Sequence, residues 1–167
     1  MIVYKGRVFT VEVDNVALPN GRQVEMAIVR HPPSVVIVPV QDDGRVVLIR
    51  QHRHAVGRAL WEFPAGSVDA QESAEAAARR ECEEEIGQVP TSLERLGGFF
   101  PTPGYCDEEM ILFKASGLRP PPGDSPHAPD DDEDIETHTM TVAEAQALVR
   151  TGEIVDLKTA YALTLLG

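Results

Sequence analysis

Two runs of β-branched residues separated by a four-residue turn most constrain what this chain can fold into. SVVIVPV (34–40) and RVVLIRQ (45–51) are almost continuously apolar, and Gln41-Asp42-Asp43-Gly44 lies between them. A turn of this composition between two strand-forming runs predicts an antiparallel hairpin. Because neither run alternates with polar residues, we expect a sheet that is buried on both faces.

The remaining pattern predicts a fold of the α/β class. Strand-like stretches recur along the chain at 7–16, 23–31, 59–63, 93–100, 109–118 and 136–140. A helix is expected from Ser73 to Ile86, stopped by Gly87. The T-x-x-E pair Thr141 and Glu144 predicts a capping box that opens a second helix to about Arg150, and 157–166 is expected to form a third. Strands between two helical regions favour a mixed sheet sandwiched between helices.

Composition narrows the classes of protein to which the chain could belong. With 167 residues, 43% of them apolar, it fits one globular domain. The net charge of −12 argues against nucleic acid or an anionic membrane as a partner. Cys82 and Cys106 have no metal-ligand spacing, and no apolar stretch reaches membrane-spanning length. We therefore expect a cytoplasmic protein in a reducing compartment.

The stretch RRECEEEIG (79–87) places many carboxylates at the end of a helix. Glu81, Glu84 and Glu85 follow the i, i+3, i+4 spacing and so share one face. Like charges at this spacing cost roughly 0.2–0.5 kcal/mol per pair, and each acid near the helix C-terminus costs roughly 0.3–1 kcal/mol. A hard divalent cation such as Mg²⁺ would compensate both costs. The alternative is a solvated surface helix with pairs Arg79–Glu83 and Arg80–Glu84.

A wider spacing carries a resemblance to a known family. The segment GSVDAQESAEAAARRECEEEIGQ (66–88) resembles the Nudix box, and it matches all seven fixed positions, Gly66, Glu72, Arg80, Glu81, Glu84, Glu85 and Gly87. It departs at Gln88, where an aliphatic residue is usual. The box implies the Nudix fold and the cleavage of a diphosphate linked to another group.

The stretches that flank the box resemble one branch of the family, the ADP-ribose pyrophosphatases and nucleoside-diphosphate-sugar hydrolases. They are LIRQHRHAVGRALWEFPAG (48–66), FFPTPGYCDEEMILFKA (99–115, with Pro103) and PDDDEDIETHTMTVAEA (129–145). This resemblance implies Mg²⁺-dependent hydrolysis of a nucleotide sugar, with ADP-ribose the leading substrate. Mn²⁺ stays open as the cation. The products would be a nucleoside monophosphate and a sugar phosphate.

The resemblance also implies roles for individual residues. The metal ligands would be the main-chain carbonyl of Ala65 with Glu81 and Glu85, and Glu84 would be an additional or bridging ligand. Arg80 would position the glutamates, and Glu72 would support the loop, pairing with Arg80. We count Glu84, Glu85 and Arg80 among the catalytic residues.

Other implied roles concern the general base and the substrate. The base would come from the acidic loop, where Glu133 is our choice and Asp131 or Glu136 could substitute. Arg53 would bind phosphate, because a guanidinium suits bidentate contact. Glu62 is assigned to the substrate region as a buried partner of an arginine. Glu108 or the adjacent Glu109 would reach the terminal sugar or its phosphate.

The N-terminal strands resemble the small extra sheet that this branch exchanges between two subunits. We therefore expect residues 1–38 to form an extension, residues 39–167 to form the Nudix domain, and the protein to be a homodimer. Three alternatives stay open: a Nudix enzyme acting on nucleoside triphosphates or dinucleoside polyphosphates, a non-catalytic module that binds nucleotide sugars, and a structural protein with a charged helix. The retained box glutamates favour catalysis, but neither the base nor the sugar follows from the sequence.

Overall fold

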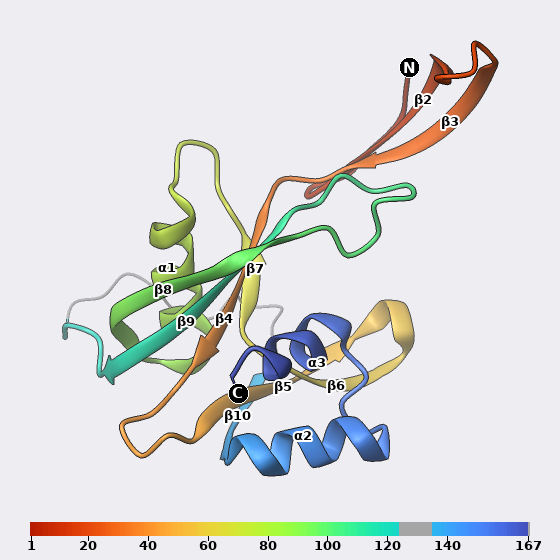
Figure 1. The fold of residues 1–167 in the computed structure, drawn as a ribbon. Coiled ribbons are helices and arrows are strands. Elements are labelled where there is room, and N and C mark those ends of the chain that lie inside the picture. The colour runs from red at the N-terminus through yellow and green to blue at the C-terminus, as the bar shows by residue number, and fades with distance from the viewer. Residues whose placement is uncertain (124–134, 167) are drawn as a thin grey trace.

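The computed structural model describes residues 1–123 and 135–166 of the chain (Figure 1). In chain order the elements are β1 (Ile2–Lys5), β2 (Thr10–Ala17), β3 (Gln23–Arg30), β4 (Ser34–Pro39), β5 (Val46–Arg53), a 3₁₀ turn (His54–Val56), β6 (Arg58–Glu62), β7 (Ala65–Ser67), α1 (Ala74–Ile86), β8 (Val89–Phe99), β9 (Met110–Arg119), β10 (Ile135–Met140), α2 (Val142–Thr151) and α3 (Leu157–Thr164).

Two sheets form the centre of the molecule. One is a mixed four-stranded sheet with the order β7-β4-β9-β8, in which β4 runs parallel to β9 and the other pairs are antiparallel. The other is an antiparallel sheet with the order β10-β5-β6. Helix α1 lies on one side of these strands and helices α2 and α3 lie on the other (Figure 1). The expected α/β class with helices on both sides is therefore confirmed.

The expected hairpin between β4 and β5 is wrong beyond its turn. The turn itself forms, with Gln41 N–H donating to the Arg45 carbonyl at 2.8 Å, and one bridge joins Val40 to Val46. From there the two strands enter different sheets, β4 between β7 and β9 and β5 between β10 and β6. Each run is apolar on both faces, so each becomes an inner strand of its own sheet. A strand pairs with it on either side, and other side chains pack on both of its faces. These long-range pairings outweigh the local preference of the turn.

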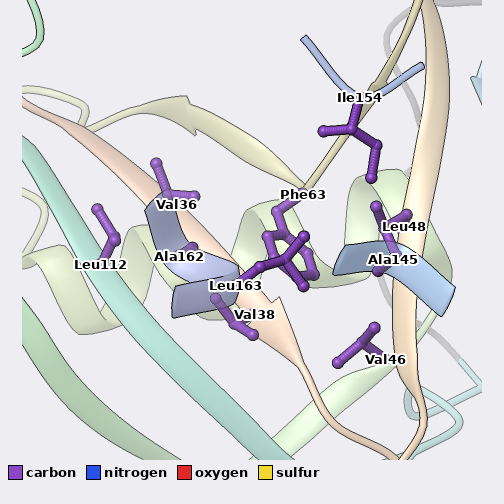
Figure 2. Close-up of a cluster of buried hydrophobic side chains, with 10 residues drawn as sticks. All are labelled: Val36, Val38, Val46, Leu48, Phe63, Leu112, Ala145, Ile154, Ala162 and Leu163. Carbon is purple, nitrogen blue, oxygen red and sulfur yellow. The ribbon is translucent and has the colours of Figure 1, made fainter. Parts of the chain in front are cut away.

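The residues of β4 divide the core into two clusters. Val35 and Ile37 pack on the α1 side with Ala77, Ala78 and Cys82. On the opposite side, Figure 2 shows Val36 and Val38 gathered around Phe63 with side chains from β5, α2, α3 and the loop between the two helices, namely Val46, Leu48, Ala145, Ile154, Ala162 and Leu163. The alternation along one buried strand places a helix layer on each face. The prediction of a strand buried on both faces is confirmed.

Helix ends follow the local signals in the sequence. Ser73 Oγ accepts the Ala76 N–H at 3.1 Å to start α1, and Gly87, in a left-handed conformation (φ 65°), ends it with its N–H on the Glu83 carbonyl. Thr141 and Glu144 form the expected capping box at α2. Ala65 and Gly66, just after Pro64, begin the short strand β7 on the edge of the sheet.

Strands β1, β2 and β3 form a separate antiparallel sheet that stands away from the rest of the molecule (Figure 1). It is tied to the loop between β8 and β9, where Val29 N–H donates to the Tyr105 carbonyl at 2.7 Å and Arg30 Nη1 pairs with Asp107 at 3.1 Å. The expected boundary at residue 38 is too late, because β4 is a fully buried strand of the central sheet. The extension ends at Arg30, just before β4.

None of the helices within residues 1–123 and 135–166 is long and apolar enough to cross a membrane.

Candidate active site

Strand β7 and helix α1 bring the two halves of the box into direct contact. Gly66 pairs with Val35 of β4, and the carboxylate of Glu81 lies over its Cα, where an added Cβ would come within 2.0 Å of Glu81 Cδ. The glycine at the start of the box therefore gives room for the Glu81 carboxylate rather than for an unusual backbone angle. Sequence spacing identified both residues, and the structure supplies the reason for the glycine.

Replacing Gly66 with alanine is expected to lower activity by about 100-fold, because the Glu81 carboxylate would have to leave its place. The β7 backbone needs no left-handed conformation there, so the protein should still fold. Steady-state kinetics together with thermal unfolding would check this, with Gly104→Ala as a control in open space. Wild-type kinetics in the Gly66 variant would contradict the proposed contact.

Arg80 lies at the centre of a network of carboxylates. Its Nη1 donates to Glu81 at 2.6 Å and to Glu84 at 2.8 Å. Its Nε and Nη2 donate to the two oxygens of Glu72 at 3.2 and 3.1 Å, and Nη2 also donates to the Ser67 carbonyl at 3.0 Å. Partial burial opposes the charged form, but these carboxylates outweigh it and raise the pKa of Arg80. All five donors are used, as expected for a residue that positions the glutamates.

The surface-helix alternative explains only part of α1. Its pair Arg80–Glu84 forms, but Arg79 donates to the Pro90 carbonyl instead of pairing with Glu83. Glu83 is buried, and its Oε1 has no hydrogen-bond partner among the described residues. Cys82 is also buried, and burial raises the pKa of its thiol to about 12, so it does not act as a nucleophile. The end of the helix is thus largely enclosed.

Glu85 is buried and ties α1 to the segment before the box. Its Oε2 accepts the Ala65 N–H at 3.1 Å. The contact involves the amide of Ala65, whereas the resemblance assigns its carbonyl to the metal. Both groups belong to the same short segment, so Glu85 and Ala65 lie together as expected.

A polar cavity of about 530 Å³ opens beside these residues. Three lining residues were assigned to metal, Ala65, Glu81 and Glu84, and Arg53 was assigned to phosphate. The rest of the lining is Arg7, Val8, Gly66, Ser67, Asp69 and Arg80. The cavity therefore brings carboxylates and guanidinium groups to one place, which suits an anionic substrate together with cations.

The donor set fits a hard divalent cation. Carboxylate and carbonyl oxygens are the ligands that Mg²⁺ prefers, and Glu81, Glu84, Glu85 and the Ala65 carbonyl supply them. In the conformation described, Glu81 and Glu84 both bind Arg80. Within the described part of the chain, no three acidic, His or Cys side chains gather closely enough to hold a metal ion. A cation bound there would therefore share these carboxylates with Arg80, which contacts Oε1 of Glu81 and Oε2 of Glu84.

Arg53 is held by a buried carboxylate. Its Nε and Nη2 donate to the two oxygens of Glu62, each at 2.8 Å, and Lys158 of α3 binds the same carboxylate. Burial would raise the pKa of Glu62, but Arg53 and Lys158 outweigh it and hold that pKa below its ordinary value of 4.5. Glu62 is 1% exposed, so the expectation that it is a buried partner of an arginine is confirmed. It is absent from the cavity lining and holds Arg53, which lines the cavity.

The other candidates fall outside the cavity lining. Glu108 accepts from Ser34 Oγ at 2.7 Å and lies 3.8 Å from the His31 ring, next to the end of β7 rather than in the cavity. Glu136 faces Arg50 across the β5–β10 pair. Glu133 and Asp131 lie outside the described residues.

Sequence reasoning missed several residues at the site. Arg7, Val8 and Asp69 line the cavity, and Lys158 binds Glu62 from the far end of the chain. Asp69 lies at an unconstrained position of the box, so its spacing gave no signal. For Arg7, the signal was a basic residue in the short turn after β1 of an otherwise acidic chain.

Comparison with known proteins agrees with this geometry. A family model described as the NUDIX domain matches residues 30–160. The chain is 35% identical over 161 residues to an ADP-ribose pyrophosphatase of Bacillus subtilis, covering 96% of this chain and 86% of that protein. It is also 35% identical over 155 residues to an ADP-ribose pyrophosphatase of Mycobacterium tuberculosis, covering 92% and 74%.

A solved structure extends the agreement to the fold. The crystal structure of an ADP compounds hydrolase superposes with a TM-score of 0.78 at 28% identity, covering 99% of this chain and 88% of that one. The expected Nudix fold is thereby confirmed over nearly the whole chain. From the matched family model, these relatives and the box geometry, the chain belongs to the Nudix family and is a Nudix pyrophosphohydrolase.

Proposed function

We propose that this enzyme hydrolyses the pyrophosphate bond of a nucleoside diphosphate sugar, with ADP-ribose as the leading substrate and Mg²⁺ as the cation. The observation that carries the proposal is that one cavity joins the box glutamates Glu81 and Glu84 to Arg53. The names of the relatives support the substrate class, since two are ADP-ribose pyrophosphatases and one is an ADP compounds hydrolase. Nudix hydrolases generally use divalent metal ions.

The box residues would hold the cation and the substrate would bind beside it. We assign Glu81, Glu84, Glu85 and the Ala65 carbonyl as ligands. When bound, a divalent cation makes a water nucleophilic and neutralises charge on the phosphoryl oxygens. Arg80 would keep the carboxylates in position, because its donors already reach Glu81 and Glu84. The two residues assigned to the substrate, Arg53 and Glu108, would bind and orient it.

Arg53 would orient the diphosphate. Its bidentate contact with Glu62 fixes the guanidinium and leaves Nη1 for the cavity that Arg53 lines. A fixed guanidinium loses less conformational entropy on binding a phosphate than a freely rotating one. Glu108 is retained as a residue for the terminal sugar, which would have to extend from the cavity toward Ser34.

Glu133 stays our proposal for the general base, by resemblance alone. Replacing it with glutamine is expected to lower kcat by about 10²- to 10⁴-fold, the contribution typical of a positioned base. Parallel Asp131→Asn and Glu136→Gln variants should retain most of the activity. Stopped assays at saturating substrate would measure this, and unchanged turnover in the Glu133 variant would remove the residue from the mechanism.

A hydrolysis screen tests the function as a whole. The purified protein would be incubated with Mg²⁺ or Mn²⁺ and ADP-ribose, ADP-glucose, GDP-mannose, a nucleoside triphosphate or a dinucleoside polyphosphate, and the products would be identified by chromatography. We expect AMP and ribose 5-phosphate from ADP-ribose, with a higher kcat/KM than for the last two classes. Preference for a triphosphate or a dinucleoside polyphosphate would overturn the substrate assignment. Binding without turnover would indicate a non-catalytic module.

We also propose a homodimer formed through the extension. The β1–β3 sheet and its turn expose apolar side chains that a second subunit would cover, namely Met1, Ile2, Val3, Tyr4, Val8, Phe9 and Met26. These apolar side chains would pack against the second subunit. This agrees with the exchange between two subunits that the resemblance implies for the N-terminal extension.

Light scattering is expected to give twice the chain mass of 18.2 kDa, or about 36 kDa. An Ile2→Asp variant should shift the mass toward the monomer, because a charge would have to be buried at the interface. Val155→Asp is the matched control, since Val155 is an exposed apolar residue outside the extension. A monomeric wild-type protein at micromolar concentration would contradict the dimer.

A further inference from the structure

A row of charged side chains of alternating sign leads from the polar cavity beside the box to the start of α3. Arg53 lines the cavity and donates to both oxygens of Glu62. Lys158 of α3 binds the same carboxylate, and its Nζ lies 3.0 Å from Oδ1 of Asp156. Lys158 is not one of the described residues that line the cavity, so its effect on a ligand there passes through Glu62 and Arg53.

The side chain of Lys158 is held in one direction. Only 11% of it is exposed, and it lines a second, apolar cavity of about 210 Å³ together with Phe99 and Tyr161. The rings of these two residues meet edge to face, with 4.8 Å between their centroids. The aliphatic stem of Lys158 therefore packs on apolar surface while its ammonium group meets Glu62. Because its rotamers are already restricted, the charge stays beside this carboxylate.

The start of α3 is fixed to the segment that carries Glu62. Asp156 caps the helix, and its Oδ2 accepts the Thr159 N–H at 3.0 Å and the Thr159 hydroxyl at 2.6 Å. Thr159 Oγ1, which is buried, accepts the backbone N–H of Phe63 at 2.7 Å. Since Phe63 directly follows Glu62, these hydrogen bonds keep Lys158 next to its carboxylate partner.

The carboxylate of Glu62 is shared by two cations. Arg53 Nη2 and Lys158 Nζ both donate to the same oxygen, Oε2. Glu62 raises the pKa of Arg53 against the effect of burial, and the acids Glu85 and Asp156 add to this rise. Without Lys158, both Glu62 and Asp156 would act on Arg53 with no ammonium group between them. The positive potential that Arg53 presents to an anion in the cavity would then be weaker.

We propose that Lys158 is a positioning residue for substrate binding, which holds the Glu62 carboxylate and offsets Asp156 so that Arg53 presents more positive charge to the diphosphate. This inference deepens the proposed function and rests on it, because the diphosphate is the group that Arg53 would bind. It gives the C-terminal helix a part in substrate affinity, although no described residue of α3 lines the cavity. A residue that acts in this way changes the binding of the substrate more than the chemical step.

Steady-state kinetics with ADP-ribose at saturating Mg²⁺ would test the role of the Lys158 charge. Lys158→Met keeps the length and the apolar stem of the side chain, and we expect KM to rise about 10-fold with kcat changed less than about 3-fold. Lys158→Arg restores the charge and should recover most of the affinity. Lys114→Met is the matched control, because it removes the same charge at a residue that lines neither cavity. An unchanged KM in Lys158→Met would overturn the proposal.

A second variant separates the electrostatic effect from damage to the fold. Asp156→Asn removes the acid that competes with Glu62 for Lys158, and asparagine is also a good N-cap, so α3 should stay folded. More of the Lys158 charge then acts on Glu62, and we expect KM to fall by about 2- to 5-fold. Damage to the fold would not improve affinity, so a raised or unchanged KM would contradict the proposal. This variant also serves if Lys158→Met does not fold.

The failure of this inference and the failure of the proposed function give different results. If wild-type protein hydrolyses no nucleotide sugar, the proposed function fails and this inference fails with it. If wild-type protein hydrolyses ADP-ribose and Arg53→Ala raises KM, while Lys158→Met and Asp156→Asn keep the wild-type KM, only the role of Lys158 fails. If Arg53→Ala also keeps the wild-type KM, the roles of both Arg53 and Lys158 fail while the hydrolysis stands.

Discussion

Replacing Glu84 with glutamine is expected to lower kcat by about 10³-fold, because the loss of a negatively charged ligand weakens the stabilisation that a divalent cation gives to the transition state. Glu84 is partly exposed, lines the cavity and contacts Arg80 at 2.8 Å. The amide of glutamine keeps the size of the side chain and can still accept a hydrogen bond from Arg80. The fold should therefore survive, and the unfolding temperature should change little.

The measurement is turnover of ADP-ribose as a function of Mg²⁺ concentration. If Glu84 is a metal ligand, the variant should also need more Mg²⁺ for half-maximal activity. Glu75→Gln is a matched control, since it lies in the first turn of the same helix and outside the cavity lining. Wild-type turnover in the Glu84 variant would remove this residue from the catalytic set.

Replacing Glu62 with glutamine is expected to have the largest effect on stability. The change leaves Arg53 and Lys158 without their shared carboxylate. Breaking a buried ion pair in this way lowers the free energy of unfolding by about 3 kcal/mol. For a chain of this size, that loss lowers Tm by about 6 to 12 °C. Lys158 keeps a contact with Asp156 at 3.0 Å, and Arg53 is partly exposed, so the loss should not be larger. Calorimetry of wild type, Glu62→Gln and the exposed control Glu136→Gln would measure it.

The lowered pKa of Glu62 leads to a prediction about the stability of the protein in acid. The pKa of Glu62 is lowered in the folded protein, so its contribution to stability is fully present above about pH 4.5, the ordinary value, and is lost as the pH falls through the depressed value. The stability difference between wild type and Glu62→Gln should therefore narrow below pH 4.5. A difference that stays constant down to pH 3 would show that the charge of Glu62 is not what stabilises the pair.

The features that sequence predicted correctly are those determined by neighbouring residues. Ser73 and Gly87 set the ends of α1, and Thr141 with Glu144 starts α2, because caps depend on side chains a few positions away. The spacing of the box also placed Glu72, Glu81 and Glu84 around Arg80, as expected for a helix that follows a short loop.

The features that were missed depend on residues far apart in the chain. The divergence of β4 and β5 into different sheets follows from their pairing with β9 and β10, which the turn between them does not determine. Lys158 reaches Glu62 across 96 positions, and no motif marks it. Glu62 was expected to be the buried partner of an arginine, but only the packing shows that this arginine is Arg53.

The way Arg80 occupies the box carboxylates has a consequence for regulation by ions. An internal guanidinium already balances Glu81 and Glu84, so we expect α1 to stay folded without divalent cations. A cation that binds there must compete with this fixed positive group, which weakens its hold on the protein. Occupancy of the cation site would then follow the concentration of free cation in solution. The activity of the enzyme would change with that concentration, while the protein stays folded.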